Sequence, residues 1–186
     1  ALGAYHFHQF KGTEQLPVSL AKIGFAPGRT IKSAPETIKR TQILVEQIRF
    51  ARDLINMPPS FLTPEKFVSL VKSALPANVR ASVKTHVQLK SEGYGGITAV
   101  GQGSANPPRL LHISYTPKGK VAKRYAYVGK GITFDTGGLA LKPAAGMEAM
   151  KSDMSGAAAV SAAVIAIAEL KLNVAIESWA PLAENM

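Results

Sequence analysis

Residues 154–182, MSGAAAVSAAVIAIAELKLNVAIESWAPL, decide the fold. The Ala-rich segment, from about Met147 or Met154 to Leu170, is apolar almost throughout and predicts a buried helix. An apolar stretch from Val174 to about Leu182 follows it and Tyr125–Val128 precedes it, and both predict strands. A strand, a helix and a second strand in this order, with nearly continuous apolar strands, indicate a βαβ unit in a buried parallel sheet.

Segments on the amino-terminal side extend this pattern. The sequence Ser33-Ala-Pro-Glu36 predicts a capping box at the start of a helix that runs to about Ile55. Thr63-Pro64-Glu65 predicts the start of a second helix, which ends near Leu75. Further strands are expected at Leu16–Phe25, Val79–Thr85, Ile97–Val100 and Leu110–Tyr115. The predicted fold class is therefore α/β, with a mostly parallel sheet flanked by helices.

The composition is that of a globular protein. With 186 residues, of which 46% are hydrophobic and 18% charged, the chain can form a substantial core. No apolar run reaches the roughly 18 residues of a membrane span, and the first residues, ALGAYHFHQFKG, lack the features of a signal peptide. We therefore expect no membrane association. Because the sequence does not start with Met, we expect it to begin inside a longer chain.

Cysteine content and net charge limit the kinds of site. The sequence has no cysteine, which excludes disulfides and thiolate chemistry and fits a cytoplasmic location. A metal would need oxygen and nitrogen ligands, which favour Mn, Mg or Zn. The formal net charge of +10 allows a nucleic-acid partner. However, even the densest basic stretch, Lys118 to Arg124, is a short turn, so nucleic-acid binding is not expected.

Two lysines and two aspartates stand in a Gly-rich stretch after the strand that ends at Val128. They are Lys130, Asp135, Lys142 and Asp153. In open α/β sheets ligands bind beyond the carboxyl ends of the strands, which is where this stretch begins. One interpretation is a divalent metal site in which the carboxylates and a neutral lysine are ligands. The alternative is a structural loop held by salt bridges.

Lys142 and the methionines allow two interpretations each. A charged Lys142 can polarise a carbonyl or hold a developing oxyanion, but it can also be an ordinary exposed lysine. Met147, Met150 and Met154 share one helix face by their spacing, which favours core packing. One of them can instead line an adaptable apolar pocket.

Residues 128–156, VGKGITFDTGGLALKPAAGMEAMKSDMSG, closely resemble the leucyl aminopeptidases, the cytosol aminopeptidase family. ARDLINMPPSFLTPEKF (51–67) and GGITAVGQGSANPPRLLHISY (95–115) are also similar to segments of that family. The resemblance implies that residues 1–30 are the end of an amino-terminal domain and a linker. Residues 31–186 would then be the first part of a metallo-aminopeptidase catalytic domain, truncated at the carboxyl end.

The resemblance also implies roles for the residues of the Gly-rich stretch. Lys130, Asp135 and Asp153 correspond to ligands of two divalent ions, Mn or Zn, with Asp135 bridging both. Lys142 corresponds to the catalytic lysine beside the scissile carbonyl, and Met150 to a residue that lines the pocket for the first substrate side chain. The reaction implied is two-metal hydrolysis that releases leucine-like amino-terminal residues from peptides.

The family has a later segment, NTDAEGR, that nothing in this sequence matches. It supplies further carboxylate ligands and an arginine that holds a bicarbonate. We therefore expect the chain alone to bind metal weakly and not to catalyse, and to need the remaining catalytic-domain segment as a partner. The resemblance also implies a homo-hexamer. The alternative function is that of a non-catalytic or DNA-binding member of the same family.

Overall fold

The computed structural model describes residues 5–12, 24 and 33–186. Along the chain the elements are α1 (Ala34–Asn56), α2 (Pro64–Ala74), β1 (Val79–Lys84), α3 (His86–Ser91), α4 (Gly95–Gly101), β2 (Arg109–Tyr115), β3 (Lys123–Val128), β4 (Gly131–Asp135), the 3-10 helix η2 (Met147–Ser152), α5 (Ser155–Glu169) and β5 (Val174–Asn185). The strand predicted at Leu16–Phe25 and the linker after it fall, apart from Gly24, outside the described residues.

The strands form one mixed sheet around the long strand β5. The order is β1-β2-β5-β3, and β4 continues along the same edge of β5 beyond the end of β3. β3 and β4 run parallel to β5, whereas the β1–β2 and β2–β5 pairs are antiparallel. The α/β class is confirmed, but only the half of the sheet that holds the predicted βαβ unit is parallel. The parallel pairs are joined by the crossover that contains η2 and α5.

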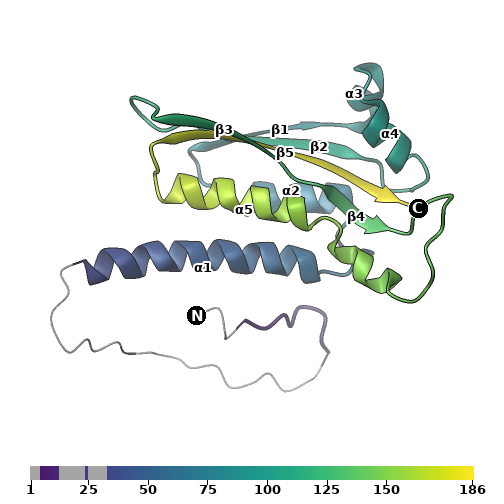
Figure 1. The fold of residues 1–186 in the computed structure, drawn as a ribbon, viewed down its shortest axis with the longest axis horizontal. Coiled ribbons are helices and arrows are strands. Elements are labelled where there is room, and N and C mark those ends of the chain that lie inside the picture. The colour runs from purple at the N-terminus through teal and green to yellow at the C-terminus, as the bar shows by residue number, and fades with distance from the viewer. Residues whose placement is uncertain (1–4, 13–23, 25–32) are drawn as a thin grey trace.

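The core lies on one face of this sheet. α5 crosses that face with α2 beside it, and α1 packs against α5 on the side away from the sheet (Figure 1). Alternate residues of β5, namely Ile176, Ala180 and Leu182, are buried against the helices. The opposite face of β5 carries Trp179, whose ring stacks on His112 of β2 with 3.9 Å between the ring centroids. The long helices therefore cover only one face of the sheet, and of the described helices only the short helix α4 contacts β5 near Trp179 and Pro181 on the other face.

Three local predictions are wrong. Ile97–Val100 belongs to the short helix α4 rather than a strand, because four residues are too few to reveal a period. The Ser33 side chain makes no capping hydrogen bond at the start of α1, unlike Thr63, which accepts one from the Lys66 N–H at 3.2 Å. β3 is exposed along its whole length, because it lies on the sheet edge instead of in a buried interior.

The Ala-rich helix is a core element. The stretch Met147–Glu169 is long and apolar enough by composition to cross a membrane, but half of it is buried inside the protein. It is also not one helix, because η2 ends at Ser152 and α5 begins at Ser155. Met154, in the break between them, is fully buried, as expected for core packing.

Candidate metal centre

Asp135 is placed by the end of β4. This strand pairs with β5 so that Asp135 lies opposite Asn185, the last residue of β5. The chain then turns sharply: the Lys142 N–H donates to the Thr136 carbonyl at 2.8 Å. Gly137 allows the turn, since its φ is +93° and a Cβ there would lie 2.3 Å from the Ala140 carbonyl oxygen.

The two carboxylate oxygens of Asp135 have different partners. Oδ1 accepts from the Gly137 N–H at 3.0 Å and from the Asn185 amide at 2.7 Å. Oδ2 pairs with the Lys142 ammonium. Burial would raise the pKa of Asp135, but the hydrogen bonds from Lys142, Asn185 and Gly137 and the Lys142 charge together hold the pKa below its ordinary value. The carboxylate is therefore kept ionised and oriented.

A second ion pair joins Lys130 to Asp153. The Lys130 ammonium lies 2.7 Å from Asp153 Oδ2. Lys130 directly precedes β4, and Asp153 lies just before α5. The first turn of α5 is fastened to the same point, because the Ala157 N–H donates to the Lys130 carbonyl at 2.8 Å. Gly129 and Gly156 make this close approach possible, since a Cβ on either would lie within 3 Å of backbone atoms of the other segment.

The residues of the two ion pairs suit a divalent cation in part. Asp153 Oδ2 is shielded from solvent and has no aligned hydrogen-bond donor despite the nearby Lys130 charge, and cations readily occupy such an oxygen. Aspartate oxygens are also ligands that Mn and Zn accept. Yet within the described part of the chain no three His, Asp or Glu side chains gather closely enough to hold an ion. The carboxylates thus provide part of a ligand set.

The structure brings the predicted site residues together as two pairs. Lys142 contacts Asp135, and Lys130 contacts Asp153, at opposite ends of β4. Met150 is half-buried on η2, and its part in a substrate pocket stays a prediction. The sequence interpretation missed β4, because its five residues lie inside the Gly-rich stretch.

Asn185 was also missed. Its side chain orients Asp135 together with Gly137 and Lys142. It ends the apolar strand β5, which runs parallel to β4. Its position was a usable signal, because polar residues at the carboxyl ends of parallel strands are candidates for ligand binding.

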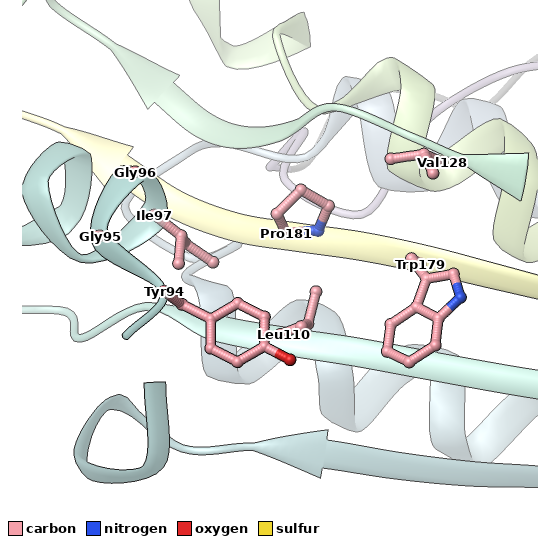
Figure 2. Close-up of a pocket in the computed structure, with 8 residues that line it drawn as sticks. All are labelled: Tyr94, Gly95, Gly96, Ile97, Leu110, Val128, Trp179 and Pro181. Carbon is pink, nitrogen blue, oxygen red and sulfur yellow. The ribbon is translucent and has the colours of Figure 1, made fainter. Parts of the chain in front are cut away.

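An open pocket of about 350 Å³ lies elsewhere, on the uncovered face of the sheet. Figure 2 shows its lining residues, which come from the region of α4 and from β2, β3 and β5: Tyr94, Gly95, Gly96, Ile97, Leu110, Val128, Trp179 and Pro181. The lining is apolar, and it includes none of the lysines or aspartates described above. This pocket is therefore an apolar surface separate from the two ion pairs.

Similarity to known proteins agrees with this geometry. The chain is 45% identical over 193 residues to a probable cytosol aminopeptidase of Rhodococcus jostii, covering 100% of this chain and 38% of that protein. Among solved structures, the bottromycin maturation enzyme BotP in complex with Mn is 36% identical with a TM-score of 0.86, over 100% of this chain and 38% of that one. Leucyl aminopeptidase from Trypanosoma brucei in complex with bestatin is 37% identical with a TM-score of 0.75. The similarity covers 80% of this chain and 29% of that one.

The chain thus spans less than two fifths of the curated relatives that it matches. The family described as cytosol aminopeptidase family, catalytic domain, matches residues 49–186. This match covers all of the strands and both ion pairs. The chain therefore belongs to the cytosol aminopeptidase family.

Proposed function

We propose that this chain is part of a metal-dependent leucyl aminopeptidase, which hydrolyses peptides and releases leucine-like residues from their amino ends. The observation that carries the proposal is the environment of Asp135. Its carboxylate is held ionised at the end of β4 by two neutral donors on one oxygen and faces a cation with the other. A carboxylate prepared in this way suits metal binding, and the family membership supplies the reaction class.

In this proposal Lys130, Asp135 and Asp153 are metal ligands. When bound, two divalent ions such as Mn or Zn would supply Lewis acidity and an activated water. Lys130 can bind only in its neutral form, which a neighbouring dication favours by charge repulsion. Lys142 then serves the substrate carbonyl as a positive charge, and Met150 lines the pocket for the first side chain.

The complete enzyme needs more than this chain, because the described residues provide too few carboxylates for two ions. We propose that the remaining catalytic-domain segment supplies the other ligands and holds a bicarbonate. It would also cover the uncovered sheet face around Trp179 and the exposed edge of β3, which now present apolar side chains to solvent (Figure 2). A cytoplasmic hexamer is part of the same proposal.

The test is hydrolysis of leucine p-nitroanilide with added Mn²⁺. The chain is assayed alone and after co-expression with the remaining catalytic-domain segment of the gene, each beside an Asp135→Asn control. Turnover is expected only with both segments and is expected to be lost in the control, which keeps the shape of Asp135 but not its charge. Metal-dependent turnover that survives Asp135→Asn would refute the proposed site.

A further inference from the structure

We infer that Asn185 is a positioning residue: it fixes the carboxylate of Asp135 so that Oδ2 is presented to a divalent cation. This inference rests on the proposed function, because it concerns the same carboxylate. It assigns a role to a residue that does not itself bind the metal.

Asn185 is held on both its main chain and its side chain. Its carbonyl oxygen accepts from the Thr136 N–H at 2.9 Å and from the Thr136 hydroxyl at 2.8 Å. Its side-chain Oδ1 lies over Gly138, where a Cβ would approach it to 2.8 Å. A side chain at position 138 would therefore displace the amide. The glycine leaves the amide room to direct its nitrogen toward Asp135.

The two oxygens of Asp135 divide their partners by charge. Oδ1 receives two neutral donors, the Gly137 N–H and the Asn185 amide, which matches the two lone pairs of a carboxylate oxygen. Oδ2 faces the one cationic partner, Lys142. Two donors on one oxygen fix the plane of the carboxylate and so fix where Oδ2 lies.

The neutrality of the Asn185 amide makes this arrangement compatible with a metal. A dication at Oδ2 repels the Lys142 ammonium, and the two compete for one oxygen. The dication does not repel the neutral donors on Oδ1 in the same way. When a metal replaces Lys142, Asn185 can therefore keep its hydrogen bond and preserve the carboxylate orientation. Partners that orient a ligand in this way commonly change metal affinity by about 10–100-fold.

The experiment measures Mn²⁺ binding to the chain co-expressed with the remaining catalytic-domain segment, by the loss of the free-ion signal in electron paramagnetic resonance. Asn185→Leu removes the donor at similar side-chain volume. Asn106→Leu is the matched control, because Asn106 donates to the buried carboxylate of Glu184, the neighbour of Asn185, at 2.9 Å. Each variant removes one amide-to-carboxylate bond, but only the first touches Asp135. Urea unfolding of all proteins measures the loss of stability.

We expect Asn185→Leu to weaken Mn²⁺ binding by about 10-fold or more and Asn106→Leu to leave it within about twofold, although both variants lose stability. Equal weakening in both would assign Asn185 a purely structural role and overturn the inference, as would unchanged binding in Asn185→Leu. Asp135→Asn separates the inferred role of Asn185 from the proposed metal site itself. Mn²⁺ binding that is lost in Asp135→Asn but kept in Asn185→Leu refutes only the role of Asn185. Binding unaffected by Asp135→Asn refutes the proposed metal site as well.

Discussion

Gly129→Ala is expected to separate α5 from the strands that carry the candidate site. An ideal Cβ on Gly129 would lie 2.3 Å from the Gly156 carbonyl oxygen and 2.7 Å from the Ala157 nitrogen. Both are backbone atoms at the start of α5, so no side chain can rotate away to relieve the clash. The φ of Gly129 is not in the left-handed region. The cost of the methyl group is therefore one of space rather than of backbone conformation.

The expected cost follows from this contact. Overpacking by one methyl typically costs about 1–3 kcal/mol. Moving α5 outward also weakens the hydrogen bond from Ala157 to the Lys130 carbonyl, which contributes about 1 kcal/mol. We expect a total of about 2–4 kcal/mol. Gly96→Ala is the control: a Cβ there meets nothing within 4 Å in α4, so it should be neutral or stabilise by about 0.4–1 kcal/mol.

Urea unfolding followed by far-ultraviolet circular dichroism and by tryptophan fluorescence measures both changes. The fluorescence reports on the sheet, because Trp179 on β5 is the single tryptophan. Equal urea midpoints for Gly129→Ala and Gly96→Ala would contradict the predicted clash between Gly129 and the start of α5. The same displacement should part Lys130 from Asp153, so Mn²⁺ binding should weaken in Gly129→Ala and stay unchanged in Gly96→Ala.

Three further predictions test other parts of the structure. Thr63→Ala should lower the free energy of unfolding by about 1 kcal/mol, whereas Ser33→Ala should change it by less than about 0.5 kcal/mol. The reason is that, of these two residues, only Thr63 accepts a capping hydrogen bond. Equal losses in urea unfolding would contradict the cap geometry. Burial and the hydrogen bond to Asp53 raise the pKa of Tyr5, so its contribution is complete below about pH 10 and lost as the pH rises through the folded pKa. The stability gap to Tyr5→Phe should therefore shrink in alkaline urea titrations, and a constant gap would refute this. Lys142→Met should abolish hydrolysis by the complete enzyme yet leave Mn²⁺ bound at least as tightly as in the unsubstituted protein, since Asp135 loses a competing cation. A parallel loss of Mn²⁺ binding would contradict this competition.

Much of the fold could be predicted from periodicity. The predicted helices at α1 and α2, and the strand at β2, match the structure within a few residues, because each is long enough or apolar enough to show its period. α4 and β4 were missed because short, Gly-rich segments have no period to read. The edge position of β3 was not predictable, since which strands pair depends on contacts far apart in the chain.

The candidate site residues could be listed from the sequence, but their pairing could not. Lys130, Asp135, Lys142 and Asp153 were identified from residue type and family resemblance, yet spacing gave no sign of which lysine meets which aspartate. Asn185 lies 50 residues from Asp135 in the sequence and meets it only through the register of β4 on β5. Such a contact depends on the tertiary fold, which local sequence patterns do not contain.

The pairing of charges links metal binding to the proposed role of Lys142. In the structure the Lys142 ammonium neutralises Asp135, while its main-chain N–H is fixed to Thr136 at 2.8 Å. A dication bound to Asp135 in place of the ammonium would release only the side chain and would leave the loop in place. On the proposed function, the Lys142 ammonium would then be available to the substrate carbonyl. The neutral amide of Asn185 can stay on Asp135 throughout, because it does not compete for Oδ2. One carboxylate with a neutral and a cationic partner would thus hold the metal and free Lys142 in the same event.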